Sequence, residues 1–244
     1  MAQLLADMAY GEHPRQRLDL FLPEKLSPRL LLFVHAGGWT GGDKAHYHAL
    51  GELLCGFGYA VALPNHRLAP EYRYPAAIED VAAATAFMLR TSQESGIRSD
   101  GILLGGHSSG GHLAALLAVH PRYQPEGDVA GVICVSGVYD LAPYYEVEGY
   151  LGPVFGPDHE VWDEASPLRH LAPGAPPFFL AYAEHDYPGA AEQAETMAEG
   201  LRRCGGHANV TRVPGRNHVT ILTGVQSMFD PLAIGLAMFL RGVR

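Results

Sequence analysis

The sequence predicts an α/β fold in which a mostly parallel central sheet is covered by helices on both faces. Two observations predict this class. Short apolar runs recur along the chain, and stretches with helical spacing or composition separate them. Buried parallel strands appear in sequence as continuous apolar runs, and the helices between them return the chain to the same edge of the sheet.

The first elements are marked by side-chain pattern and by their breakers. Residues 18–22 alternate polar and apolar side chains, whereas 30–35 and 59–63 are continuous apolar runs. A partly exposed strand is therefore expected before two buried strands. A stretch with helical composition at 45–57 lies between the two buried strands. A second helix is expected at 75–90, where a proline occupies the first turn.

The later elements repeat the alternation. Helices are expected at 109–119, at 190–204 and at 221–240, because these stretches are rich in helix formers and end near Gly or Pro. Four more strands are expected between and before these helices. They lie at 101–105, 129–135, 178–183 and 207–213.

The whole chain, 1–244, is predicted to form a single domain with one insertion. Its 244 residues suit one large domain of this class. No repeat of fixed period and no linker divides it. Residues 141–177 break the alternation with Pro, Gly, Tyr and acidic residues, which predicts an inserted, lid-like excursion over the sheet edge.

Composition and charge exclude several classes of protein. The formal net charge of -9, with only 17 scattered Lys and Arg residues, disfavours nucleic acid as a partner. Cys55, Cys134 and Cys204 are an odd number without a C-x-x-C pair, so no disulfide framework or zinc knuckle is expected. No run reaches the ~18 apolar residues of a membrane span, and the start lacks a signal-peptide pattern. We expect a cytoplasmic protein whose partners are a small-molecule substrate and a second copy in a homodimer.

Residues 106–110 read Gly-His-Ser-Ser-Gly and match G-x-S-x-G, a pattern that places a nucleophilic serine on a tight turn. The expected strand before this segment and the expected helix after it are the context that the motif requires. Glycines on either side of Ser108 let the strand and the helix approach closely. A phosphate-binding loop is disfavoured, because Gly111 and His112 stand where that loop needs Lys and Ser or Thr. We predict Ser108 as the nucleophile.

A glycine pair follows the expected strand 30–35. Gly37 and Gly38 leave room for two backbone N–H groups to turn toward one oxygen, as an oxyanion hole for acyl transfer requires. With the N–H of Ser109, just after the nucleophile, they are the predicted donors. A simple turn at Gly37 and Gly38 would be the better interpretation if Ser108 were absent.

The base and the acid should follow the nucleophile in the order acid, then base. His218 comes directly after the expected strand 207–213 and before the terminal helix, so we predict it as the base. His207 begins that strand and would lie at the opposite edge of the sheet. The predicted acid is Asp186, which follows the strand 178–183.

Two other carboxylates remain alternatives for the acid. Glu184 is adjacent to Asp186, and Asp140 follows the expected strand that ends at residue 135. Asp186 could instead fill a turn or helix-start position, which is a common role for Asp.

These residues together resemble the carboxylesterase branch of the α/β-hydrolases, which includes hormone-sensitive-lipase-like esterases, kynurenine formamidases and bacterial carbohydrate-ester hydrolases. Residues 65–71 (NHRLAPE) and 74–80 (YPAAIED) are similar to that branch's Y-R-L-A-P-E and F-P-A-x-x-x-D segments. Ala36 replaces the first Gly of the branch's H-G-G-G loop, and His66 stands where Tyr is usual. The resemblance implies the α/β-hydrolase fold, here with no large N-terminal cap because few residues precede the strand 30–35.

The predicted function is that of a serine carboxylesterase, which hydrolyses short-chain acyl esters through an acyl-enzyme. The alternatives are an arylformamidase acting on N-formylkynurenine with the same triad and a non-catalytic relative that binds a small ligand. No cofactor and no metal are expected, because His46 and His48, with Asp43 nearby, lack a third well-placed ligand. The side chains expected to line the substrate pocket are Trp39, His107, Tyr144 and Phe155.

Overall fold

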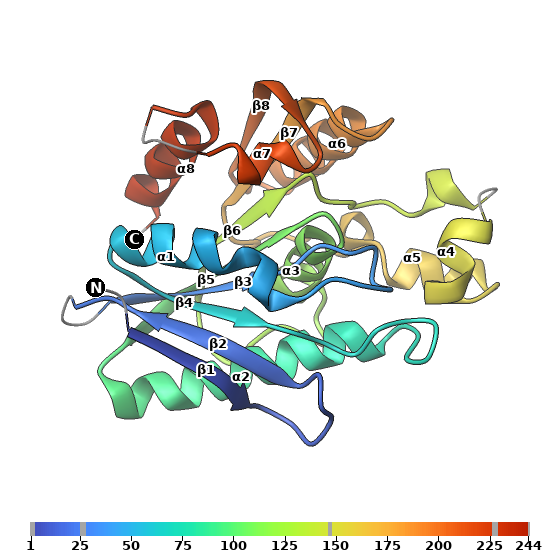
Figure 1. Cartoon of the computed structure of the whole chain (residues 1–244). Helices are drawn as coiled ribbons and strands as arrows, with labels where there is room; N and C mark the ends of the chain where they lie inside the picture. The colour runs from blue at the N-terminus through green and yellow to red at the C-terminus, as the bar shows by residue number, and fades with distance from the viewer. Residues whose placement is uncertain (1–2, 25–27, 146–147, 226–228, 244) are drawn as a thin grey trace.

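A single eight-stranded sheet forms the centre of the protein (Figure 1). The structure is a computed structural model that describes residues 3–24, 28–145, 148–225 and 229–243. The strands are β1 (Gln3–Ala9), β2 (Arg17–Leu22), β3 (Arg29–Val34), β4 (Tyr59–Pro64), β5 (Arg98–His107), β6 (Val129–Val135), β7 (Phe178–His185) and β8 (Ala208–Asn217). Their order in the sheet is β1-β2-β4-β3-β5-β6-β7-β8.

The sheet is mostly parallel. β2 pairs antiparallel with both β1 and β4. All the pairs from β4 through β3 to β8 are parallel. The structure thereby confirms the predicted fold class, an α/β protein with a mostly parallel sheet.

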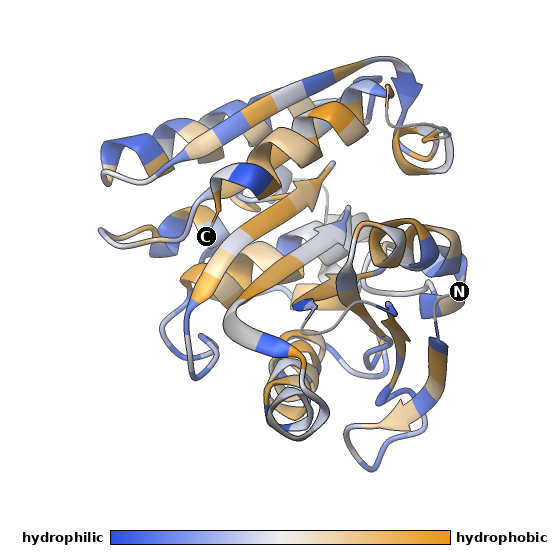
Figure 2. Cartoon of the chain, turned by 90° about the vertical axis from the view of Figure 1, so that its left-hand side faces the viewer, coloured by the Kyte–Doolittle hydropathy of each residue, from blue (hydrophilic) through white to orange (hydrophobic). Residues whose placement is uncertain are grey.

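Helices cover both faces because successive residues of the central strands point to opposite sides. In β3, Leu30 and Leu32 pack with α2 (Ala76–Ser95), α3 (Ser109–Val119) and α6 (Ala190–Arg203). Leu31 and Phe33 pack on the other side, with α1 (His48–Gly56), α7 (Thr220–Thr223) and α8 (Pro231–Gly242). Figure 2 shows the central strands coloured largely as hydrophobic, which is the pattern of strands buried on both faces.

The strand expected to be partly exposed at 18–22 is β2, and its residues 18–21 are buried because its two faces pack into the two hydrophobic clusters of the core. The elements differ in extent from the predicted ones at three further places. β1 was not predicted, because this edge strand is exposed along most of its length and carries a register shift between Leu5 and Met8. The helix expected at 45–57 begins with a separate 3₁₀ turn, η1 (Lys44–Tyr47). The helix expected at 221–240 is divided into α7 and α8, and Asp230 caps the start of α8 by accepting from the N–H of Leu232 at 2.9 Å.

The predicted excursion contains four short helices outside the sheet. They are η2 (Ala142–Tyr144), α4 (Glu148–Phe155), α5 (His159–Glu164) and η3 (Pro167–His170), and residues 146–147 of the excursion lie outside the described part of the chain. Trp162 is fully buried there, and its indole N–H donates to the carbonyl of Gly156 at 2.8 Å. Figure 1 shows α4 and α5 at the end of the molecule away from α8. Among the described helices, none combines the length and the apolar character that crossing a membrane requires.

Candidate active site

The turn between β5 and α3 holds Ser108 in a strained backbone conformation. Its φ of 54° and ψ of -120° lie where residues with a side chain seldom occur. A Cβ on Gly106 would lie 2.2 Å from the carbonyl oxygen of Gly110, and a Cβ on Gly110 would lie 2.2 Å from that of Val34. Both glycines are therefore required sterically, as the G-x-S-x-G pattern indicated.

Ser108, His218 and Asp186 form a continuous hydrogen-bonded chain. The Oγ of Ser108 is 3.0 Å from Nε2 of His218, and Nδ1 of His218 is 2.6 Å from Oδ1 of Asp186. Their elements end at the same edge of the sheet, because the carboxyl ends of the parallel strands β5, β7 and β8 meet there. The structure thus brings together the three residues that the sequence analysis selected.

The carboxylate of Asp186 is buried and fully engaged. Its side chain is only 3% exposed. Besides His218, it accepts hydrogen bonds from the hydroxyl of Ser136 at 2.5 Å and from the N–H groups of Ala183 and Tyr187, each at 2.9 Å. Burial alone would raise the pKa of Asp186, but these hydrogen bonds outweigh it and lower the pKa to about 2.

The alternative acid and base residues are engaged elsewhere. Glu184 accepts from Arg212 and from the N–H of Gly215, both at 2.7 Å. Asp140 accepts from the N–H of Ala142 at 3.2 Å and pairs with Arg169. His207 precedes β8, and its carbonyl accepts from the first residue of β7, so it lies at the opposite edge of the sheet.

The loop after β3 has the conformation that an oxyanion hole requires. Gly37 has a φ of 140°, and a Cβ there would lie 2.2 Å from the carbonyl oxygen of Gly41. Gly38 follows with a φ of 59°. No acceptor within the described residues takes the N–H of Gly37 or of Gly38. The N–H of Ser109 begins α3, where the helix dipole favours negative charge.

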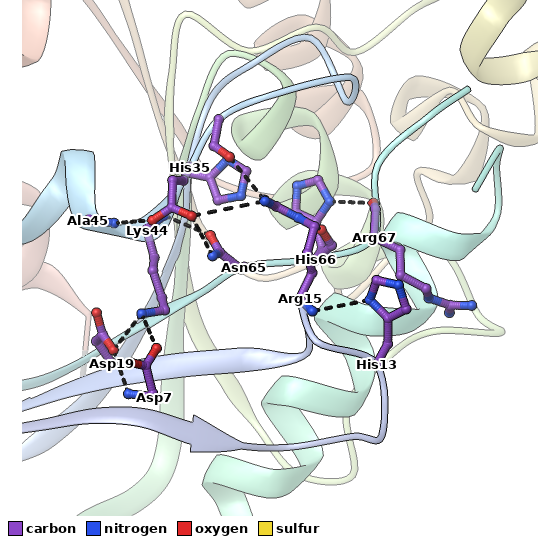
Figure 3. Close-up of polar contacts among 12 residues, drawn as sticks. Asp7, His13, Arg15, Asp19, His35, Lys44, Ala45, Asn65, His66 and Arg67 are labelled. Carbon is purple, nitrogen blue, oxygen red and sulfur yellow. Dashed lines mark hydrogen bonds and ion pairs between the residues drawn. The ribbon is translucent and has the colours of Figure 1, made fainter. Parts of the chain in front are cut away.

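An ion cluster with a buried centre, Lys44 and Asp19, anchors the chain that follows this loop (Figure 3). The ammonium of Lys44 lies 2.7 Å from Asp19, which is 1% exposed, and 2.8 Å from Asp7. Burial would lower the pKa of Lys44, but the hydrogen bonds to these carboxylates raise it above its ordinary value. Asn65 completes the anchor, because it accepts from the N–H of Lys44 and donates to Asp43, both at 2.7 Å.

Two stacked histidines lie behind the oxyanion loop. The rings of His35 and His66 are parallel within 10°, with their centroids 4.6 Å apart. Burial lowers the pKa of His35 to about 3 and that of His66 to about 4, so both are neutral. Arg15 ties the region together by donating to the carbonyls of His66 at 2.7 Å and Gly42 at 2.9 Å. His66, which stands where the related branch usually has Tyr, therefore packs against the first residue of the loop.

A cavity of about 700 Å³ opens beside Ser108. Ser108, His218, Gly37 and Gly38 lie along its polar side, together with His107 and Tyr47. Its other side is largely apolar and is formed by residues of α1 and of the α7 region. These residues are Ala49, Leu50, Leu53, Val219, Leu222 and Val225.

Trp39, Tyr144 and Phe155 are not among the described residues that line this cavity. The φ of 59° at Trp39 turns its side chain inward, where its indole N–H donates to Nδ1 of buried His112 at 3.1 Å. Phe155 packs on Trp39 with ring centroids 5.3 Å apart. Tyr144 lines a different cavity, beside Asp140. Of the expected pocket residues, the structure brings only His107 to the cavity.

Sequence reasoning missed two polar residues that shape the site. Ser136 follows β6 with a φ of 51° and donates to Asp186. Tyr47 lies in η1, and its hydroxyl contacts both the oxyanion loop and His107. Both act across long sequence separations, and a serine or tyrosine side chain alone carries no local signal of such a partner. Among the described residues, no group of His, Cys, Asp and Glu side chains is arranged to hold a metal ion.

This geometry is suited to acyl transfer. A buried carboxylate orients an imidazole, the imidazole contacts a serine hydroxyl, and the glycine loop lines the same cavity. Such an arrangement can activate a hydroxyl for attack on a carbonyl carbon and hold the negative charge that then forms on the carbonyl oxygen.

Comparison with known proteins gives concordant matches. The model of the BD-FAE family matches residues 18–201. Esterase LipC of Mycobacterium tuberculosis is 30% identical over 96% of this chain and 64% of its own length. Kynurenine formamidase of Danio rerio is 28% identical over 91% of this chain and 77% of its own length. The chain spans between 51% and 64% of the length of the first three curated relatives that it matches.

Solved structures share the fold along almost the whole chain. An inhibited esterase B from Lactobacillus rhamnosis superposes with a TM-score of 0.86 at 22% identity, over 99% of this chain and 86% of that one. A truncated carbohydrate esterase from gut microbiota superposes with a TM-score of 0.84 at 20% identity, over 98% of this chain and 96% of that one. At these identities the likeness concerns the fold.

Proposed function

The chain belongs to the BD-FAE family, and on that premise we propose that it is a serine carboxylesterase that hydrolyses short-chain acyl esters. One observation carries this proposal. A serine hydroxyl, an imidazole and a buried carboxylate are linked by contacts of 3.0 Å and 2.6 Å beside a cavity that also contains the oxyanion loop. The likeness to esterase LipC supports the same class of reaction.

In the proposed mechanism, Ser108 Oγ attacks the ester carbonyl carbon while its proton passes to Nε2 of His218. The resulting imidazolium is stabilised by Asp186, which stays ionised because its pKa is about 2. The N–H groups of Gly37, Gly38 and Ser109 hold the oxyanion. His218 then gives its proton to the departing alkoxide, which leaves an acyl-enzyme.

Deacylation repeats these steps with water as the nucleophile. His218 removes a proton from water, the hydroxide attacks the acyl carbon, and the collapse of the second tetrahedral intermediate returns the proton to Ser108. Each oxyanion donor contributes on the order of 3 kcal/mol to lowering the barrier. The residues of this chain supply every group that the proposed reaction uses, so neither a cofactor nor a metal enters the scheme.

An arylformamidase acting on N-formylkynurenine is the second candidate function. A specific observation favours it, because kynurenine formamidase of Danio rerio aligns with this chain over 77% of its own length. The same triad would attack the formyl carbon, with an arylamine in place of an alcohol as the leaving group. Parallel assays of ester and formamide hydrolysis separate the two candidates, and a higher kcat/KM for the formamide would replace the esterase proposal.

The proposed function is tested by hydrolysis of p-nitrophenyl acetate, butyrate and octanoate. We expect Ser108→Ala to lose at least ~1000-fold in kcat while keeping its fold, and rates to fall from butyrate to octanoate. His207→Gln, an exposed residue at the opposite edge of the sheet, is the matched control. An inactive wild type that also forms no adduct with a fluorophosphonate probe would instead support a non-catalytic, ligand-binding relative.

We propose in addition a cytoplasmic, single-domain protein that assembles as a homodimer. Cys55, Cys134 and Cys204 are all free thiols, which agrees with a reducing compartment. Two apolar side chains of α8 are exposed, Ile234 by 45% and Met238 by 69%. Exposed apolar side chains of this kind mark surfaces that contact another protein, which supports the homodimer. Light scattering on the purified protein tests the assembly, and a monomeric mass would refute it.

A further inference from the structure

A chain of hydrogen bonds crosses the polar side of the cavity and joins the oxyanion loop to the base. The N–H of Ala36 donates to the hydroxyl oxygen of Tyr47 at 3.0 Å. The same hydroxyl lies 2.8 Å from Nδ1 of His107. Nε2 of His107 lies 2.8 Å from the carbonyl oxygen of His218.

The backbone groups at the two ends of this chain of hydrogen bonds determine which atom donates and which accepts in each bond. A backbone N–H can only donate, so the oxygen of Tyr47 accepts from Ala36 and keeps its own proton for Nδ1 of His107. A backbone carbonyl can only accept, so Nε2 of His107 carries the proton and donates to His218. The two ends thereby select a single neutral tautomer of His107, and every donor and acceptor in the chain is satisfied.

His107 is held in this neutral state by its surroundings. Its side chain is buried, with 6% exposed. Burial and, after it, the neighbouring His218 lower the pKa of His107 to about 4. The two rings are 4.9 Å apart, so a charged His107 would oppose the imidazolium that the proposed mechanism forms on His218.

The bridge connects segments that are otherwise independent in sequence. Tyr47 lies in η1, which begins just after Asp43 and includes the buried Lys44. His107 ends β5 immediately before Ser108. His218 follows β8, and Ala36 follows β3. The bridge therefore spans the oxyanion loop, the turn that carries the nucleophile and the loop that carries the base, and the relative placement of these three sets the attack geometry.

We propose that Tyr47 and His107 are positioning residues that hold the oxyanion loop and the base in register around Ser108. This inference rests on the proposed function of the same site. His107 was expected to bind substrate, but both of its ring nitrogens are engaged by protein groups. Its effect therefore passes through His218 and Tyr47.

The expected effect is on turnover. Catalytic groups must be held within about 0.5 Å of the productive geometry, and a misplacement of about 1 Å can lower the rate ~100-fold. We therefore expect His107→Leu, which removes both hydrogen bonds, to lower kcat for p-nitrophenyl butyrate by about 10- to 100-fold. The KM should change less than about threefold, because both ring nitrogens of His107 are engaged by protein groups and neither is free to bind substrate.

Two amide variants separate the two ends of the bridge. Gln at position 107 can place its amide N–H near the Nε2 position and so keep the bond to the His218 carbonyl, whereas Asn reaches only the Nδ1 side. We expect His107→Gln to retain kcat within about fivefold of the wild type and His107→Asn to behave like His107→Leu. Rescue by Gln and not by Asn is a result that general loss of packing would not produce.

Tyr47→Phe tests the other end, with Tyr59→Phe as the matched removal of a hydroxyl from the far end of β4. Because Tyr47 and His107 act through one bridge, the effects of Tyr47→Phe and His107→Leu on kcat should be strongly non-additive in the double variant. Thermal unfolding of each variant identifies any that fail to fold, and the Gln and Asn pair keeps the inference testable in that case.

The outcomes distinguish this inference from the proposed function. If Ser108→Ala abolishes hydrolysis but Tyr47→Phe and His107→Leu have wild-type kcat, the bridge has no positioning role. If these two variants change KM alone, His107 contacts substrate and the inference is wrong. If Ser108→Ala remains fully active, the proposed function itself fails.

Discussion

Replacing Asp186 with Asn removes the negative charge of the carboxylate while nearly keeping the shape of the side chain. In the wild type, Oδ1 accepts from His218 and from the N–H of Tyr187, while Oδ2 accepts from Ser136 and from the N–H of Ala183. An amide offers one oxygen and one NH₂ group. In either orientation the NH₂ group faces a backbone N–H, so one buried donor loses its partner.

Both the stability and the rate should fall. An unsatisfied buried donor lowers the free energy of unfolding by about 1–3 kcal/mol. With the NH₂ group toward His218, the imidazole takes the tautomer that carries its proton on Nε2 and cannot accept the proton of Ser108. That loss lowers kcat by about 10³- to 10⁴-fold in triads of this kind.

The stability deficit should also depend on pH. The folded pKa of Asp186 is about 2, below its ordinary value of 3.8, so its carboxylate stabilises the fold above pH 3.8. That contribution is lost as the pH falls toward 2, because the side chain is then protonated. The difference in unfolding free energy between wild type and Asp186→Asn should be constant above about pH 5 and shrink toward pH 2.

Urea unfolding from pH 2 to 8 and hydrolysis of p-nitrophenyl butyrate at pH 7.5 measure these effects. Asp140→Asn is the control, because Asp140 was the alternative acid and pairs instead with Arg169. Folded Asp186→Asn with kcat within tenfold of the wild type would refute the assignment of the acid. A large loss in Asp140→Asn, with Asp186→Asn unaffected, would transfer the role to Asp140.

Three further predictions concern the turn, the anchor and the chemistry. Gly110→Ala should lower the unfolding free energy in urea by about 3 kcal/mol, because the Cβ would lie 2.2 Å from the Val34 carbonyl oxygen; unchanged stability would contradict this. Lys44→Met removes the ammonium from buried Asp19, which keeps its contacts to Nε2 of His48 and the N–H of Asp7, and should lower the unfolding free energy by about 3 kcal/mol. Arg203→Met, at an exposed pair, should change stability by less than ~1 kcal/mol. Equal losses of unfolding free energy in the two variants would mean that the ion cluster around Lys44 stabilises the fold no more than an exposed ion pair does. Incubation with EDTA should leave the esterase rate unchanged, and activity lost to EDTA and restored by zinc would require a metal in the mechanism.

The strand–turn–helix around Ser108 could be predicted because its requirements are local. Glycines, an apolar strand and a helix must be adjacent in sequence, and the contacts of Gly106 and Gly110 show why no larger residue fits. His218 and Asp186 could be selected because parallel strands bring their carboxyl ends to one edge. From chain order alone, Glu184 and Asp140 stayed candidates for the acid, and only the spatial arrangement distinguishes them from Asp186.

The features that could not be predicted depend on where side chains point and on contacts between residues distant in the chain, which the order of residue types does not specify. Trp39 is adjacent to the oxyanion loop in sequence, yet its positive φ directs the indole away from the cavity and toward His112. Tyr47 reaches Ala36 and His107 across 11 and 60 residues. The edge strand β1 has an exposed, irregular pattern, so periodicity gives no signal for it.

Mapping of a fluorophosphonate adduct by peptide mass spectrometry tests the central claim, that Ser108 is the nucleophile, most directly. The wild-type protein should lose its esterase activity in proportion to labelling, with a single adduct on Ser108, and folded Ser108→Ala should take up no label. An adduct on Ser109 or another residue, or complete inactivation while Ser108 remains unmodified, would contradict the assignment.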